Sequence, residues 1–308
     1  MRVLVVGAGA VGGDFGGRLA QAGRDVTFLV RARRAEELKE RGLRIVSPYG
    51  DLTLDPAVVT TEQIAGPYDL ILLGVKSYSL EGAMDSLAPA VGSGTMILPA
   101  LNGMRHIDRL SMRFGKCVLG GVCLVAAEVG KDGTIRQLAD FQKLIYGELD
   151  GPPTPRIEAV DATLRGAGFE TAISDHILRD LWQKWVQLAS LGAVNCLLRG
   201  SIGQIVAIPG GADLCLAILG ECAEIAKASG FAQSEAFLKQ HGAALTANGV
   251  ATTSSMFRDL RKGLPVEADT IVGDLLRRGQ ELGLKTPLLE AAFVNLSIYQ
   301  RERLIAAS

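Results

Sequence analysis

The sequence predicts an α/β fold in which an N-terminal Rossmann-type domain with a parallel sheet precedes an all-helical C-terminal domain. Short apolar runs alternate with helix-like segments up to about residue 175, and almost only helical patterns follow. The runs are continuously rather than alternately apolar, and they lie at 2–6, 25–30, 69–75 and 95–99. Strands that are covered on both faces have this pattern, which is typical of parallel sheets with helical crossovers.

Six helical patterns make up the expected C-terminal domain, at 176–198, 211–229, 233–247, 252–262, 266–282 and 288–304. Three of them are followed by a glycine, a common stop signal of a helix, at Gly230, Gly263 and Gly283. Strand-like pieces within 117–149 are expected to add strands to the first domain. We therefore predict one domain over 1–175 and a second over 176–308.

The charge of the chain excludes whole classes of partner. Its 32 basic and 33 acidic residues give a formal net charge of −1. No long-range attraction to nucleic acid or to an anionic membrane surface is expected from such a balance. The most apolar later stretch, 185–198, is too short and too polar to span a bilayer. We expect a cytoplasmic protein that binds a small molecule, as a monomer or a homodimer.

Cysteine and histidine usage argues against a metal site. The 5 cysteines are scattered and form no CxxC pair, and the 3 histidines lie far apart. Zinc and iron sites need clustered ligands, so no metal is expected. Buried thiols in a reducing compartment are the simpler interpretation.

A glycine motif follows the first predicted strand directly and opens the first helix. It has the form GxGxxG and consists of Gly7, Ala8, Gly9, Ala10, Val11 and Gly12. In this position the three glycines permit a tight turn, a close approach of the backbone to a pyrophosphate, and close packing of helix on strand. The helix N-terminus adds free N–H groups and the positive end of the helix dipole. The motif therefore predicts a dinucleotide site.

The end of the second strand distinguishes NAD from NADP. An NAD-binding domain places an acidic residue there for the ribose 2′-hydroxyl. Here Val30 is followed by Arg31, Arg33 and Arg34, and no acidic residue occurs before Glu36. Guanidinium groups suit a 2′-phosphate, which a carboxylate would repel. We predict NADP (NADPH) as cofactor with Arg31 on the 2′-phosphate; the second contact is left open between the other two arginines.

Further motifs lie in a fixed order along the rest of the chain. They are Val75-Lys76, 101–104 (Leu-Asn-Gly-Met), 181–185 (Leu-Trp-Gln-Lys-Trp), 254–260 (Ser-Ser-Met-Phe-Arg-Asp-Leu) and Glu267. With the glycine motif, they resemble the ketopantoate reductase family over essentially the whole length. The resemblance implies NADPH-dependent reduction of a 2-keto acid to a 2-hydroxy acid.

The resemblance implies that Lys184 is the proton donor of this reaction. Negative charge develops on the carbonyl oxygen as hydride arrives, and a proton donor at that oxygen lowers the barrier. Lysine suits the role when partial burial lowers its pKa, and Trp182 and Trp185 offer apolar surroundings. The alternative is an ordinary exposed lysine on a helix.

Four further residues receive roles from the same resemblance. Lys76 and Asn102 follow strands, where open α/β sheets bind ligands, and both are expected to contact cofactor and substrate. Glu267 is expected to position the substrate hydroxyl or Lys184, and Ser255 to bind the substrate carboxylate. The alternatives are a plain turn at Asn102, a first-turn glutamate and a capping serine.

Two positions depart from the family pattern. The family has asparagines four and eight residues after the catalytic lysine, where this chain has Leu188 and Gly192. Asn195 lies nearly on the face of Lys184, roughly 16 Å further along the helix, and is retained as a candidate substrate contact. Leu188 and Gly192 indicate a more apolar or roomier pocket.

Three functions are therefore weighed. The first is reduction of 2-dehydropantoate (ketopantoate) to pantoate, which would feed pantothenate synthesis. The second is the same chemistry on a more apolar or bulkier 2-keto acid, and Leu188 and Gly192 favour it. The third is a non-catalytic NADPH-binding regulator. The presence of Lys184, Ser255 and Glu267 together argues against it, because a regulator needs no proton donor.

Overall fold

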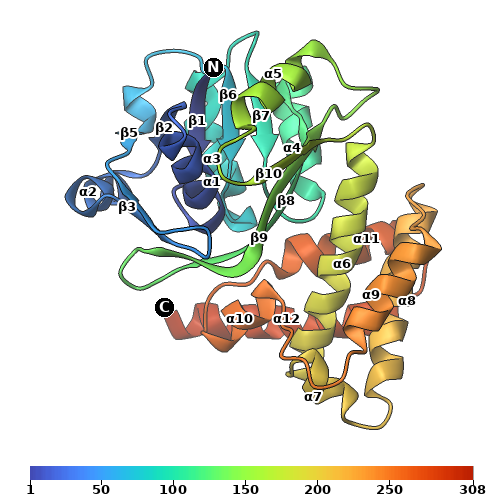
Figure 1. Ribbon diagram of the computed structural model, residues 1–308. Helices are drawn as coiled ribbons and strands as arrows, with labels where there is room; N and C mark the ends of the chain where they lie inside the picture. The colour runs from blue at the N-terminus through green and yellow to red at the C-terminus, as the bar shows by residue number, and fades with distance from the viewer. Residues whose placement is uncertain (308) are drawn as a thin grey trace. The chain divides into compact units, whose positions relative to one another are not determined.

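A computed structural model describes residues 1–307, and the chain divides into two units. The first unit comprises Met1–Leu101 and His106–Asp180, and the second comprises Asn102–Arg105 and the chain from Leu181 onward. Residue 175, the predicted boundary, lies in the loop between β10 (Glu170–Ile173) and α6 (Ile177–Leu198). Figure 1 shows the elements of both units.

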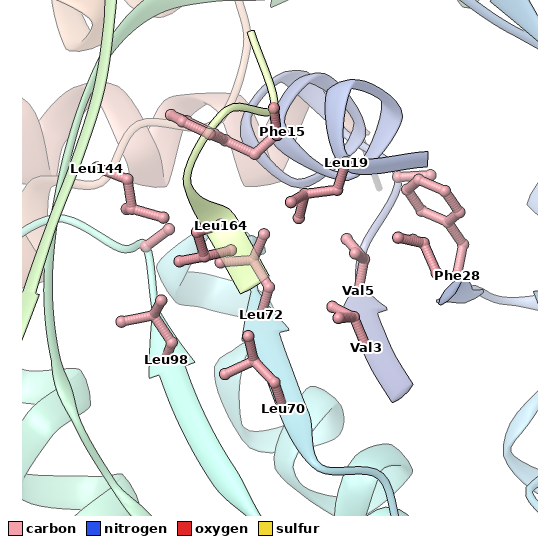
Figure 2. Packing of buried hydrophobic residues seen from close by; sticks show 14 of the residues in the cluster. Val3, Val5, Phe15, Leu19, Phe28, Leu70, Leu72, Leu98, Leu144 and Leu164 are labelled. Atoms are coloured by element: carbon pink, nitrogen blue, oxygen red, sulfur yellow. The ribbon is translucent and has the colours of Figure 1, made fainter. Parts of the chain in front are cut away.

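Five parallel strands form the first sheet, in the order β5-β2-β1-β6-β7. Their bounds are β1 Arg2–Val6, β2 Asp25–Leu29, β5 Ala57–Val59, β6 Leu70–Leu73 and β7 Met96–Pro99. Alternate residues point to opposite faces of such a sheet. Val3 and Val5 belong to one buried cluster, with Phe15 of α1 (Ala10–Gln21), whereas Leu4 and Val6 belong to another. Both faces are covered, which explains the continuous apolar runs. Figure 2 shows the cluster that contains Val3, Val5 and Phe15.

Helices cover the two faces of this sheet. The cluster in Figure 2 includes residues of α1 and of α5 (Pro155–Leu164). The opposite cluster includes residues of α3 (Leu80–Leu87) and α4 (Arg105–Phe114). α2 (Ala32–Arg41) follows β2, and short 3₁₀ turns lie at Thr61–Gln63, Ser77–Ser79, Ala88–Ala90 and Gly115–Cys117.

A second, mixed sheet completes the first unit, in the order β10-β9-β3-β4 with β8 paired to β9. β8 (Gly120–Val129) and β9 (Ile135–Gly147) are the strands expected within 117–149. β3 (Leu43–Val46), β4 (Leu52–Leu54) and β5 were not expected, because runs of three or four residues carry little periodicity.

The second unit is helical, as predicted, and the predicted fold class is confirmed. Its helices are α6, α7 (Ile202–Val206), α8 (Gly211–Ala228), α9 (Glu235–Leu245), α10 (Ser255–Arg261), α11 (Asp274–Glu281) and α12 (Pro287–Ala307). The short α7 was not expected, and the segment predicted as one helix over 266–282 begins instead with a π-helical turn, η5 (Asp269–Gly273).

The cysteines, the potential metal ligands and the long helices can be examined within the described residues. All five cysteines are free thiols. Within residues 1–307, no cluster of three or more potential ligands could hold a metal ion. No helix in that range is both long and apolar enough to cross a membrane.

Candidate active site

The glycine motif forms a tight turn between β1 and α1. Gly7 has φ +93°, a left-handed conformation that favours glycine, and its N–H donates to the Leu29 carbonyl at 3.1 Å. A Cβ at Gly12 would lie 2.1 Å from the Gly7 carbonyl oxygen. A Cβ at Gly9 would meet no atom within 4 Å. Two of the glycines are therefore required by the turn itself, and the second glycine leaves open space beside the backbone.

This turn fits a pyrophosphate. Gly9 precedes the first residue of α1, and the first N–H groups of a helix have no acceptor within it. Open space at Gly9 lets phosphate oxygens approach those groups, and the helix dipole favours their charge. The chain's own geometry at Gly7–Gly12 thus matches the requirement of a dinucleotide cofactor.

The three arginines after β2 differ in their surroundings. Arg31 precedes α2 and is exposed. Arg33 pairs with Glu37 at 3.1 Å, and its side chain is 92% exposed. Arg34 also pairs with Glu37, at 3.0 Å, and donates to the Ala8 carbonyl at 3.4 Å. These two guanidinium groups lower the pKa of Glu37. Arg34 is thus the arginine that contacts the glycine motif.

Lys76 follows β6 close to the same motif. A Cβ at Gly74 would lie 2.6 Å from the Cα of Gly12, so the end of β6 packs directly on the glycine turn. Two residues later, Lys76 is exposed and precedes the 3₁₀ turn Ser77–Ser79. The structure therefore brings the Lys76 segment and the glycine motif together within the first unit.

In the second unit, the segments that carry three candidate residues contact or directly precede the π-helical turn η5. Trp185, next to Lys184, donates its indole N–H to the Ile271 carbonyl at 2.9 Å. A Cβ at Gly103, next to Asn102, would lie 2.8 Å from the Thr270 carbonyl oxygen.

Glu267 lies at the start of the same segment, where its carbonyl accepts the N–H of Ile271 at 3.0 Å. The segments that carry Lys184, Asn102 and Glu267 therefore meet at one short turn. π-Helical turns occur frequently at functional sites.

Lys184 is buried within the helical unit. Its residue is 8% exposed, and Glu267 is 7% exposed. Trp182 and Trp185 flank it in the sequence, with ring centroids 4.9 Å apart, and both indole rings lie under the Arg278 guanidinium. This burial excludes the alternative of an ordinary exposed lysine, and the expected apolar surroundings are present.

Ser255 is the first residue of α10. The preceding Ser254 caps that helix, because its hydroxyl accepts the Phe257 N–H at 3.1 Å. Ser254, not Ser255, therefore has the capping role, and Ser255 is half-buried at the helix N-terminus. A hydroxyl there, beside the positive end of a helix dipole, is suited to an anionic group.

Two family descriptions match the chain. Residues 3–151 match "Ketopantoate reductase PanE/ApbA", and residues 176–300 match "Ketopantoate reductase PanE/ApbA C terminal". The chain belongs to this family. The resemblance inferred from the motifs is confirmed, and the protein is an oxidoreductase.

Relatives and solved structures are similar to this chain over nearly their full length. The uncharacterized oxidoreductase YkpB of Bacillus subtilis (strain 168) is 34% identical over 98% of this chain and 100% of its own. The crystal structure of 2-dehydropantoate 2-reductase from Geobacter metallireducens GS-15 has a TM-score of 0.87 at 29% identity, over 97% of this chain and 99% of that one. The ternary structure of D-mandelate dehydrogenase with NADH and anilino(oxo)acetate shares the fold, with a TM-score of 0.88 at 20% identity over 99% and 100% of the two chains.

The side chain of Asn195 bonds to the backbone of two other segments of the helical unit. It is fully buried, and both ends of its amide bond to backbone groups. The amide nitrogen donates to the Gly200 carbonyl, and the amide oxygen accepts the Ser254 N–H, each at 2.8 Å. Each end of the amide therefore has a backbone partner, and the expected substrate contact of Asn195 stays a prediction. Asn195 anchors the residue that precedes Ser255.

Two features of this candidate site were not predicted from the sequence. One is the η5 turn, for which the sequence offers no known signal. The other is the set of contacts made by Arg34, one of the two arginines left open above, with the carbonyls of Ala8 and of Gly133, the latter at 3.5 Å. A guanidinium near a glycine motif was foreseeable, but which arginine contacts the motif was not.

Proposed function

We propose that the protein catalyses the NADPH-dependent reduction of a 2-keto acid to the 2-hydroxy acid. The observation that carries the proposal is the burial of Lys184, next to Trp185, whose indole N–H bonds to the η5 turn, while the buried Glu267 precedes that turn in the chain. The glycine cradle at Gly7–Gly12 supports a dinucleotide as the reductant. A buried ammonium group with no function would be costly, because desolvation of a charge opposes folding.

Each residue has a defined task in this reaction. A dihydronicotinamide held by the glycine cradle at Gly7–Gly12 would supply the hydride to the carbonyl carbon C2. Lys184 donates its proton to the carbonyl oxygen, so that the alkoxide charge never fully develops, and the neutral amine then takes a proton from solvent. Glu267 orients the Lys184 ammonium or the new hydroxyl, and Ser255 donates to the substrate carboxylate. Lys76 and Asn102 bind cofactor and substrate.

Two classes of substrate fit these tasks. 2-Dehydropantoate is supported by the names of relatives such as the Geobacter metallireducens enzyme, and its reduction would yield pantoate for pantothenate synthesis. A 2-keto acid with a more apolar side chain is supported by Leu188 and Gly192. Both classes need the same hydride acceptor and the same proton donor.

The test of the function is the oxidation of NADPH by the purified protein with a panel of 2-keto acids that includes 2-dehydropantoate. We expect turnover with at least one of them, with the 2-hydroxy acid as product by chromatography. A protein that binds NADPH tightly but reduces no member of the panel would instead be the regulator considered above.

Replacing Arg31 by alanine is expected to weaken NADPH binding by about 10- to 100-fold, the usual contribution of a hydrogen bond to a charged group. NADH, which lacks the 2′-phosphate, should bind almost as before. Fluorescence titration of the two nucleotides measures this difference. Arg33→Ala is the matched control, because that side chain is 92% exposed and already paired with Glu37. Equal losses for NADPH and NADH in Arg31→Ala would remove Arg31 from the 2′-phosphate site.

A further inference from the structure

The face of α6 that carries Lys184 is apolar for two turns beyond it. Residues four and eight positions later lie on the same face of a helix, about 6 Å and 12 Å along its axis. These residues are Leu188, which is half-buried, and Gly192, which is buried. Leu191 lies between them and is also half-buried. A substrate that binds at Lys184 and extends along α6 would therefore contact apolar residues.

Met256 fills the space over Gly192. A Cβ at Gly192 would lie 2.6 Å from the terminal methyl carbon of Met256, which is 3% exposed. Met256 directly follows Ser255, the candidate for the substrate carboxylate. The glycine on α6 and the methionine on α10 are thus complementary, and together they place a thioether where a longer side chain on α6 would otherwise lie.

The polar side chains of Ser190 and Asn195, further along α6, form hydrogen bonds within the protein. Both ends of the Asn195 amide bond to backbone groups. The Ser190 hydroxyl donates to the Val186 carbonyl at 2.7 Å and lies 2.9 Å from His241 Nε2. Gln187, at the edge of the Lys184 face, is exposed to solvent. A hydroxyl on the substrate side chain would therefore lose its hydration without a partner from the buried part of this face.

We propose, building on the reductase function above, that the substrate is a 2-keto acid with an apolar side chain, and that Leu188 and the Met256–Gly192 contact select against a side-chain hydroxyl. Burial of a hydroxyl without a hydrogen bond is unfavourable. An apolar pocket discriminates against an isostere that adds a hydroxyl by about 100-fold at most.

Two 2-keto acids that differ by a single hydroxyl test this selection. 2-Dehydropantoate carries a hydroxyl on the branched side chain, and 3,3-dimethyl-2-oxobutanoate has hydrogen in its place. We expect kcat/KM with NADPH to be higher for the second compound by about 10- to 100-fold. Higher or equal kcat/KM for 2-dehydropantoate would overturn the inference and leave the reductase function intact. Turnover of no 2-keto acid would defeat the proposed function itself, and the inference with it.

Substitutions on α6 test whether Leu188 and Gly192 determine which 2-keto acid is preferred. Leu188→Asn offers an amide one turn from Lys184, and we expect it to move the ratio toward 2-dehydropantoate by about tenfold or more. The double variant Gly192→Asn with Met256→Ala, in which the methionine is shortened to admit the new side chain, should act in the same direction. Leu197→Asn is the matched control, because Leu197 is also half-buried on α6 but lies on the side away from Lys184.

An unchanged ratio in folded Leu188→Asn and in the double variant would show that these residues do not select the substrate. Circular dichroism establishes folding of each variant. If the variants fail to fold, the comparison of the two keto acids by the wild-type protein still decides whether a hydroxyl is disfavoured.

Discussion

Replacing Lys184 by methionine lowers kcat by about 10²–10⁴-fold, the usual contribution of a general acid, and leaves NADPH binding almost unchanged. Methionine has a similar length and suits a buried, apolar position, so the substitution removes the ammonium group while it preserves packing beside Trp182 and Trp185. Steady-state NADPH oxidation measures kcat, and fluorescence titration measures the nucleotide Kd. The two readouts separate loss of the proton donor from loss of the fold.

Lys227→Met is the matched control for this variant. Lys227 is on α8, its side chain is 66% exposed, and it pairs with Glu224 at 3.6 Å, so its removal should leave kcat unchanged. Retention of wild-type turnover in Lys184→Met would exclude Lys184 as the proton donor. A large rise in the Kd for NADPH would indicate a cofactor-binding role instead.

Replacing Asp14 by asparagine raises the free energy of unfolding at pH 8 by about 3 kcal/mol. Asp14 is on α1, directly behind the glycine motif, and is completely buried. Burial raises the pKa of its carboxyl from 3.8 to about 6, against smaller opposing effects of the Arg18 charge and the Gln142 amide. A difference of about two units corresponds to about 3 kcal/mol at 1.36 kcal/mol per unit.

The pH dependence of this gain has a defined sign. The folded state holds the Asp14 proton more tightly than the unfolded state, so ionisation costs folding free energy as the pH rises from 3.8 to about 6. The cost is fully present above about pH 6 and absent below 3.8. The advantage of Asp14→Asn should therefore be largest at pH 8 and shrink toward zero as the pH falls to 4.

Urea unfolding at several pH values measures this advantage. Asp25→Asn is the control, since Asp25 is exposed on β2 and should change stability by no more than about 0.5 kcal/mol. A constant difference between Asp14→Asn and the wild type across this pH range would contradict the assigned cost of burying the Asp14 charge.

The features that the sequence predicted well depend on local constraints. A strand, the Gly7–Gly12 turn and a helix follow one another within about twenty residues, and each glycine has a steric reason that can be read from spacing. The buried sheet likewise follows from continuous apolar runs, because both of its faces are covered. The burial of Lys184 follows in the same way from its apolar neighbours on α6.

The features that it did not predict depend on partners far along the chain. Helical periodicity places Asn195 near the face of Lys184. It does not show that the backbone N–H of Ser254, 59 residues later, donates a hydrogen bond to the Asn195 amide oxygen. The departure at Gly192 is visible in the sequence, whereas the methionine that fills its space is not. The π-helical turn contacts Trp185 and Gly103, which lie far from it in the sequence, and no local propensity encodes these contacts.

In the proposed reaction, the hydride of NADPH arrives at C2 of a 2-keto acid while Lys184 protonates the carbonyl oxygen. The most direct measurement uses NADPH labelled with deuterium at C4 of the nicotinamide, in separate preparations for each face of the ring. We expect one preparation to yield a 2-hydroxy acid with deuterium on C2, detected by mass spectrometry and NMR, and the other to yield unlabelled product. NADPH oxidation without deuterium at C2 from either preparation would contradict the proposed reaction.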